Sequence, residues 1–127
     1  MAPIQKPVSA PKIYSRARAI EDGELIDVTE TAAREGFTVP VAFTRSAYLK
    51  AVIDAIEWMR FADDVSEELQ REGVLDMIHF YVVQAPPADR YAVAFDIAAG
   101  RVAFEVVCGT DDDGGTCVTI TLATDRP

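Results

Sequence analysis

The chain has 127 residues, 50% of them apolar and 26% charged, so it is long enough for one domain with its own core and too apolar for a disordered chain. Its formal net charge of −9 disfavours direct binding to nucleic acid and favours partners with basic surfaces. Its longest apolar stretch, residues 74–85, is interrupted by Asp76 and His79 and is too short to cross a bilayer.

The first residues differ from the rest in charge and in proline content. Residues 1–12 contain three prolines and lack the apolar segment of a signal peptide, so we expect a flexible arm that is poorly ordered unless a partner holds it, and a cytoplasmic protein. Residues 13–127 are predicted to form a single domain. Residues 1–18 carry four basic side chains and no acid, which leaves −13 on residues 19–127. This negative charge has a second explanation besides a basic partner, because many proteins are acidic simply for solubility.

A small strand–helix unit is predicted next. Residues 15–22 can form one helical turn that ends at Gly23, and residues 25–28 are typical of a short strand. Thr29 is the expected N-cap of a helix over residues 30–35 that ends at Gly36. Residues 37–43 are extended, and Pro40 within them predicts an edge strand or a strap across the core.

Two longer helices are predicted in the middle of the chain. Apolar residues recur at helical spacing over residues 45–62, after Thr44 as N-cap. The second helix is predicted over residues 66–84 and ends before two prolines. Gly73 inside it predicts a kink or a close helix crossing. The residues expected on its buried side are Leu69, Leu75, Ile78 and Val82.

The last third alternates apolar and polar residues, which predicts three antiparallel strands. A four-residue loop over residues 98–101 would place Phe95 opposite Phe104, with the large apolar side chains on one face. The third strand would then pair Phe104 with Leu122. The same register places Cys108 on the core face and Cys117 on the other face, so we expect no disulfide between them and at most one reactive thiol.

These elements predict an α+β fold. We expect a C-terminal three-stranded antiparallel meander packed on two longer helices, preceded by the small N-terminal strand–helix unit.

Two segments resemble a known family. The stretch from Ile13 to Tyr48, which begins IYSRARAIEDGELIDVTETAAREGF, and the ending VCGTDDDGGTCVTITL are similar to an uncharacterised family of small acidic proteins carried on bacterial plasmids, integrative elements and phages. The resemblance brings no functional residues with it. It implies a mobile-element setting.

Few residues suggest catalysis or metal binding. The turn DDDGGT at residues 111–116 lacks the bidentate Glu of a calcium loop, because Leu122 stands at the twelfth position, so a solvated hairpin turn is favoured. His79 is the one histidine and fits a boundary position. No nucleotide, hydrolase or redox motif occurs. We therefore expect neither a cofactor nor an enzyme, and a small enzyme using Cys117 or a carboxylate pair is the less favoured alternative.

Two acidic patches are the candidate partner-binding sites. The acids Asp64, Glu68 and Glu72 are four residues apart in the sequence, a spacing at which like charges weaken a helix. Either a binding function or an ordinary solvated face, with Arg71 neutralising part of the charge, explains this row. The predicted site residues are Glu57, Asp63, Asp64, Glu67, Glu68 and Glu72, with Asp111, Asp112 and Asp113 of the turn.

The function predicted from these observations is that of a non-enzymatic mobile-element binding protein. Its concrete form is an anti-defence inhibitor, anti-CRISPR or anti-restriction, that uses an acidic surface as a nucleic-acid mimic and occupies a basic site on a host protein. The alternative is an accessory or regulatory interaction module for plasmid or phage maintenance, whose partner is encoded by the element. Neither hypothesis involves direct nucleic-acid binding or a membrane.

Overall fold

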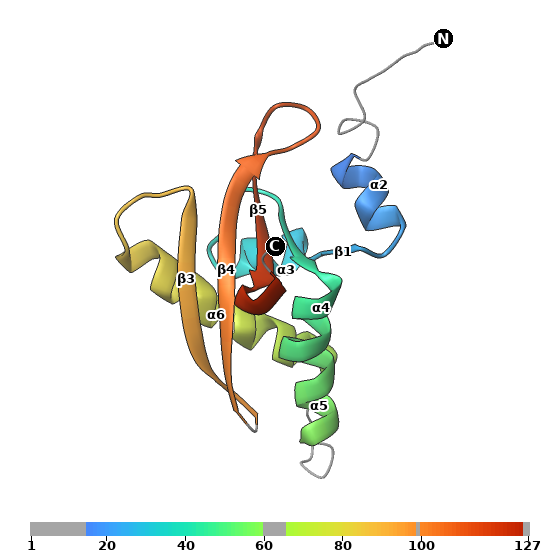
Figure 1. Ribbon diagram of the computed structural model, residues 1–127, viewed down its shortest axis with the longest axis vertical. Coiled ribbons are helices and arrows are strands. Elements are labelled where there is room, and N and C mark those ends of the chain that lie inside the picture. The colour runs from blue at the N-terminus through green and yellow to red at the C-terminus, as the bar shows by residue number, and fades with distance from the viewer. Residues whose placement is uncertain (1–14, 60–65, 99, 126–127) are drawn as a thin grey trace.

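The fold is a five-stranded mixed sheet with its main helices on one face (Figure 1). The computed structural model describes residues 15–59, 66–98 and 100–125; the predicted arm and the candidate residues Asp63 and Asp64 lie outside them. The strands are β1 (Leu25–Asp27), β2 (Val41–Thr44), β3 (Arg90–Ile97), β4 (Gly100–Thr110) and β5 (Thr116–Leu122). The helical segments are α2 (Arg16–Glu21), α3 (Thr29–Arg34), α4 (Arg45–Tyr48), the π-helical turn η2 (Leu49–Ile53), α5 (Asp54–Trp58), α6 (Glu67–Gln84) and the 3-10 turn η3 (Ala123–Asp125).

The α+β class predicted from the sequence is confirmed, and the predicted meander forms three of the five strands. The strand order is β1-β2-β5-β4-β3, with β2 and β5 parallel and the other neighbours antiparallel. Val41, Phe43 and Ile120 point to the same face as Phe104 and are buried there with Leu75 and other residues of α6. The helices α3, α4, α5 and α6 therefore cover one face of the whole sheet.

Strand β2 lies inside the sheet, so the predicted edge strand or strap is wrong. Its main chain pairs with β1 on one side and β5 on the other. Pro40 stands one residue before the strand, where its missing N–H is not needed, and its carbonyl accepts a 2.8 Å hydrogen bond from the Val118 amide. The parallel neighbour β5 is far away in the sequence, and no local pattern indicates such a pair.

The hairpin between β3 and β4 is tighter than predicted. Ile97 lies opposite Gly100, so Phe95 faces Val102 and Val93 faces Phe104. The predicted pairs are therefore wrong by two residues, a shift that keeps every side chain on its predicted face. The turn requires Ala98 at φ +51°, a conformation that alanine rarely adopts, so the sequence carries no signal for it.

The β4–β5 register agrees with the prediction. Phe104 lies opposite Leu122, Val106 opposite Ile120, and Thr110 opposite Thr116. The rings of Phe95 and Phe104 still contact each other diagonally, with 5.5 Å between their centroids. The meander thus supplies the apolar face that the helices cover.

The first long helix contains a wider turn in its middle. Thr44 caps it as predicted, accepting a 3.4 Å hydrogen bond from the Ala47 amide, and the π-helical turn η2 separates α4 from α5. The side-chain amide of Gln70 in α6 donates a 3.1 Å hydrogen bond to the Ala51 carbonyl within this turn. A π-helical turn changes the main-chain bonding pattern, and Gln70 supplies a partner from the neighbouring helix.

The predicted buried side of α6 is wrong, and one of the two explanations predicted for Gly73 does not hold. Leu69 is 58% exposed, whereas Val74, Leu75 and Ile78 are buried, so the buried side begins one turn later than predicted. A Cβ added at Gly73 would meet nothing within 4 Å. No close helix crossing therefore explains this glycine.

The small N-terminal unit forms with one shift. Ser15 caps α2 with a 3.0 Å bond from the Arg18 amide. Helix α3 begins at Thr29, so the predicted N-cap at Thr29 is displaced. Asp27 instead accepts from the Thr29 amide and hydroxyl, at 3.1 and 2.6 Å, and so satisfies an amide at the start of the helix.

Candidate functional site

The predicted acidic row on α6 faces α3 and is bridged by arginines. Glu68 pairs with Arg34 of α3 and with Arg71 of its own helix, and Arg34 Nη2 also lies 3.5 Å from Glu72 Oε2. The hydrogen bond from Arg71 lowers the pKa of Glu68. Because arginines stand beside these carboxylates, the like-charge repulsion along the row is offset by opposite charge.

Glu67 belongs to a polar cluster between α4 and α6. The Tyr48 hydroxyl donates to the Glu67 carboxylate, and Arg71 Nη1 donates to the same hydroxyl at 3.0 Å. Burial, and then the hydrogen bond to Glu67, raise the pKa of Tyr48 to about 12. The phenol is therefore protonated at ordinary pH, and Glu67 ties two helices together as well as carrying charge.

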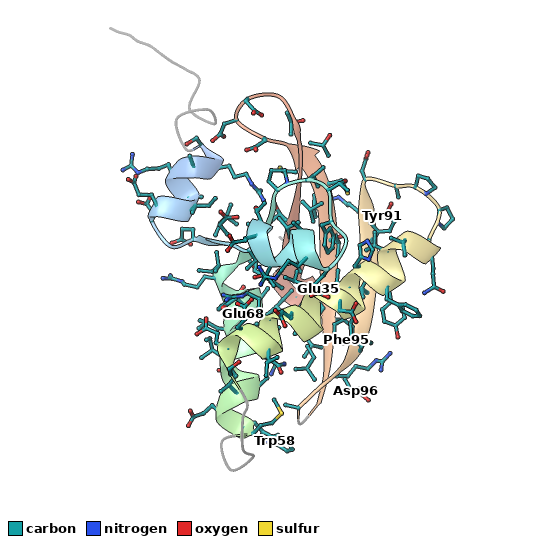
Figure 2. The ribbon with its side chains drawn as sticks, turned by 180° about the vertical axis from the view of Figure 1, so that it is seen from behind. Glu35, Trp58, Glu68, Tyr91, Phe95 and Asp96 are labelled. Atoms are coloured by element: carbon teal, nitrogen blue, oxygen red, sulfur yellow. The ribbon has the colours of Figure 1, made fainter. Side chains whose placement is uncertain are left out.

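Helices α3 and α6 pack side by side, which adds acids that the sequence did not connect with the row. Glu30 lies one turn before Arg34, and Asp76 one turn after Glu72, while Figure 2 shows Glu35 and Glu68 on the same helical side of the molecule. Five carboxylates on these two helices and a sixth on Glu35, the C-cap of α3, stand against two arginines, a local balance of −4. We define the acidic helical face as Glu30, Glu35, Glu67, Glu68, Glu72 and Asp76.

The other predicted acids lie elsewhere. Glu57 is exposed near the end of α5, whereas the turn that holds residues 111–113 lies at the opposite end of the molecule (Figure 1). The structure therefore does not bring the two predicted patches together. A single surface cannot be formed from both of them.

The acidic turn between β4 and β5 has a structural role. Asp112 accepts hydrogen bonds from the main-chain amides of Arg16 and Ala17, at 2.9 and 3.0 Å. The bonds from Ala17 and then Arg16 lower the pKa of Asp112. Asp111 accepts from the Asp112 amide, and Asp113 from the Gly115 amide. The carboxylates of Asp111 and Asp113 thus stabilise the turn itself, and that of Asp112 joins the turn to α2.

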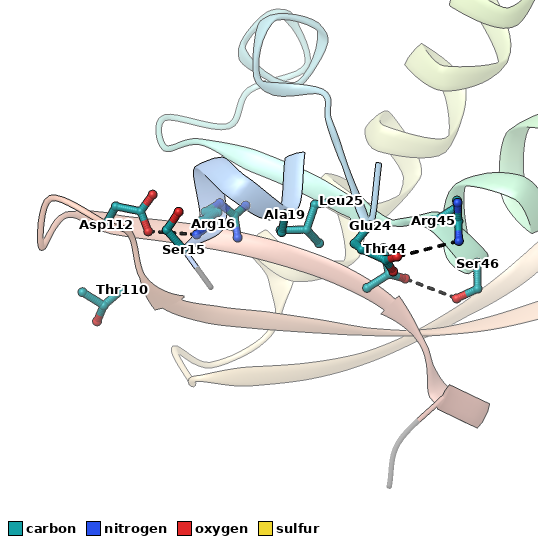
Figure 3. A pocket seen from close by; sticks show the side chains of 10 residues that line it. All are labelled: Ser15, Arg16, Ala19, Glu24, Leu25, Thr44, Arg45, Ser46, Thr110 and Asp112. Carbon is teal, nitrogen blue, oxygen red and sulfur yellow. Dashed lines mark hydrogen bonds and ion pairs between the residues drawn. The ribbon is translucent and has the colours of Figure 1, made fainter. Parts of the chain in front are cut away.

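An open groove of about 930 Å³ lies between α2, the start of α4 and the β4–β5 turn (Figure 3). Its sides carry charges of both signs, including Arg45, which lies 3.8 Å from Glu24. Among the described residues that line it there is no histidine or cysteine. The lining residues are Ser15, Arg16, Ala19, Glu24, Leu25, Thr44, Arg45, Ser46, Thr110 and Asp112.

The groove side chains are largely engaged in bonds that hold the fold. Arg16 donates to Thr119 Oγ1 at 2.7 Å and to the Val118 carbonyl at 2.8 Å, so it fastens α2 to the face of the sheet opposite the main helices. Thr44 caps α4. His79 lies apart from the groove, with its ring 5.1 Å from that of Phe37. The geometry supplies no nucleophile with an adjacent base here.

The two cysteines project from opposite faces and are free, as predicted. Their accessibility is the reverse of the prediction: Cys117 is buried and Cys108 is half-buried. Arg16 of α2 reaches the face that carries Cys117, where Thr119 is its neighbour, so this face is covered. Burial raises the pKa of Cys108, which lowers its reactivity as a thiolate.

Within the described ranges, no three side chains among His, Cys, Asp and Glu are grouped so that they could hold a metal ion. No described helix is both long and apolar enough to span a membrane.

No family model matches the chain, and no curated protein or solved structure matches it significantly.

Proposed function

We propose that this chain is a non-enzymatic binding protein of a mobile element that inhibits a host defence system, of the CRISPR or restriction type. It does so by occupying a basic, nucleic-acid-binding surface of a host protein with its acidic helical face. The observation that carries the proposal is the packing of α3 against α6, which gathers six carboxylates and two arginines on two neighbouring helices and the C-cap of α3.

The spacing of the acids suits a charged partner surface. Glu68, Glu72 and Asp76 follow one another at four-residue intervals, about 6 Å apart along the helix axis. Arg34 ties this row to α3, so the charges are held in place before binding and less conformational entropy is lost on association. A field of one sign also speeds encounter with a basic partner.

The resemblance over residues 13–48 supports the mobile-element setting of the proposal. The same setting fits an accessory module for plasmid or phage maintenance, which differs only in its partner. That partner would be a protein encoded by the element and not a host nuclease.

The experiment is affinity capture of the full chain from plasmid-bearing or phage-infected cells, followed by binding measurements with the captured partner. Glu30 and Asp76 are exposed and make no ion pair with another described residue, so their joint reversal to Lys changes the face without breaking a bridge. Binding should weaken at least about tenfold, and the wild-type affinity should fall as salt rises.

The matched control reverses Glu21 and Asp54 to Lys. These acids are exposed on α2 and α5 and produce the same change in net charge. Equal loss in both variants would indicate a general charge effect, and an affinity indifferent to salt and to both variants would contradict the proposal. Capture of an element-encoded protein would favour the accessory module.

A further inference from the structure

Strand β3 is an eight-residue edge of the sheet, with no other described strand beyond it (Figure 1). The Cys108 amide donates to the Asp89 carbonyl at 2.8 Å, and residues of an antiparallel pair alternate between bonding the neighbour and facing away from it. The even-numbered residues of β3 therefore direct their main-chain groups away from β4. They are Arg90, Ala92, Ala94 and Asp96.

This edge has little of the protection that soluble proteins usually give to one. Proline, lysine, a bulge or a covering segment commonly prevents edge strands from pairing. The sequence RYAVAFDI contains neither proline nor lysine, and its register with β4 is unbroken. Among the described residues, one side-chain hydrogen bond reaches the outward-facing main chain of this edge, from Arg101 Nη2 to the Ala94 carbonyl at 3.4 Å.

An apolar strip on α6 borders the same edge. Phe80, Tyr81 and Val83 are 55%, 41% and 61% exposed, and residues 80–88 carry no charge although the chain has a net charge of −9. The Tyr81 ring stacks on Phe95 of β3, with 6.2 Å between centroids, and Figure 2 shows Phe95 and Tyr91 beside α6. Exposed apolar surface next to a free edge marks an interface.

We infer that β3 pairs with β3 of a second copy of this chain, antiparallel about a two-fold axis at Val93. Charge complementarity selects this partner and this register. With Val93 at the axis, Arg90 lies opposite Asp96 of the second copy, and the two-fold repeats the pair. Within its own chain Arg90 also lies 3.0 Å from Glu105, but its side chain is 58% exposed, so the second copy's Asp96 would join an existing ion pair. Moving the two-fold axis by one residue in either direction gives the two neighbouring registers in which outward-facing residues still meet. In both of them Arg90 and Asp96 lie opposite alanines, so neither charge gains a partner of opposite sign.

The side chains on both faces suit this pairing. On the face away from the main helices Ala92 lies opposite Ala94, and on the helical face Tyr91 lies opposite Phe95. A hollow of about 270 Å³ lined by Gly73, Met77 and Phe95 opens where β3 ends. The two-fold brings the start of the second β3, with the apolar strip of its α6, toward this hollow. Apolar surface would thereby be removed from water.

This surface is separate from the one in the proposed function. It uses the β3 edge and the exposed apolar residues Phe80, Tyr81 and Val83 of α6, none of which belongs to the acidic helical face. The two surfaces approach each other only at Asp76, which lies one turn before Phe80 on α6, and the variants that test the dimer change neither residue. The dimer therefore stands or falls independently of the acidic partner surface.

The test is sedimentation of the full chain from about 1 to 200 µM. A monomer–dimer equilibrium is expected. Asp96→Lys places a positive charge opposite Arg90 and should weaken self-association at least about tenfold, while Asp96→Glu should preserve it. Asp96 is paired only with the exposed Arg101 among the described residues, at 3.4 Å, so folding should survive. Glu21→Lys on α2 is the control of equal charge.

Ala92→Pro is the second variant. It removes an amide that points away from β4, so the monomer loses no ladder bond while the dimer loses two, one from each copy. Circular dichroism checks that each variant folds. If Ala92→Pro does not fold, the result for Asp96→Lys alone tests the dimer. A monomer at every concentration, or a dimer that resists Asp96→Lys, would overturn the inference.

Discussion

Asp112 joins the β4–β5 turn to the first turn of α2, because its carboxylate accepts hydrogen bonds from the amides of Arg16 and Ala17, 96 and 95 residues away in the sequence. The carboxylate favours these bonds when ionised, since its pKa is lowered by them. A group with a lowered folded-state pKa stabilises above its unfolded pKa, and the effect is lost as the pH falls through the folded value.

Docking of α2 should therefore be intact at neutral pH and should loosen below about pH 4. Amide NMR shifts of Ala17 followed across this range would measure it. Asp112→Ala should loosen α2 at pH 7, although the bonds from Arg16 to Thr119 and Val118 remain, and should speed trypsin cleavage after Arg16 and Arg18. Asp113→Asn, in the same turn, should leave both readouts unchanged. Equal cleavage rates in the two variants would show that Asp112 does not hold α2.

Replacement of Gln70 should destabilise the helix pair. Gln70→Leu removes the side-chain hydrogen bond to the Ala51 carbonyl of the π-helical turn, and loss of one such bond costs about 0.5–1.5 kcal/mol. Urea unfolding measures the change in free energy. Gln84→Leu is the control, because Gln84 bonds only within α6, to the Phe80 carbonyl at 2.9 Å. Similar losses in both variants would contradict the importance of the contact with Ala51.

Two glycines should respond to alanine in opposite directions. Gly36 has φ +111°, and a Cβ there would lie 2.5 Å from His79 Cε1, so Gly36→Ala should cost more than about 1 kcal/mol. Gly73 lies in α6 with open space around it, so Gly73→Ala should stabilise by about 0.5–1 kcal/mol. Thermal melts of both variants check the signs. A stabilising Gly36→Ala would mean that the loop can rearrange.

Phe104 should be among the most sensitive core positions. Its side chain is 1% exposed and contacts Phe95, so Phe104→Ala should cost about 3–5 kcal/mol. Arg101→Ala on the same strand should cost less than about 1 kcal/mol, since its ion pair with Asp96 is exposed. A denaturant midpoint close to wild type for Phe104→Ala would show that this face is not the core.

Thiol labelling should distinguish the two cysteines. Cys108 is half-buried and should react slowly at neutral pH, because burial raises its pKa, and faster as the pH rises. Cys117 is buried and should react only on unfolding. Single Cys→Ser variants assign the two rates. Faster labelling of Cys117 in the native protein would show that α2 leaves that face open.

The spacing of residues in the sequence determined which side chains share a face of a strand or helix. It did not determine which segments, far apart in the sequence, pack against each other. The alternation of residues 91–97 and 116–122 and the period of residues 67–84 follow from local geometry, so the α+β class, the β4–β5 register and the Ser66-capped helix α6 were predictable. The β3–β4 hairpin was mispredicted because a shift of two residues leaves the apolar pattern unchanged.

For the candidate site, too, the sequence showed the charged residues but not their partners. The charges of Glu68, Glu72 and Asp112 are visible in the sequence, whereas their partners Arg34 and the α2 amides come from segments 34 to 96 residues away. The parallel pair of β2 and β5, the adjacency of α3 and α6, and the open edge of β3 depend likewise on contacts across the chain. The sequence alone determined which side chains carry charge or apolar surface. Only the tertiary structure decided which of them are paired, buried or free, because burial and ion pairing depend on distance in space.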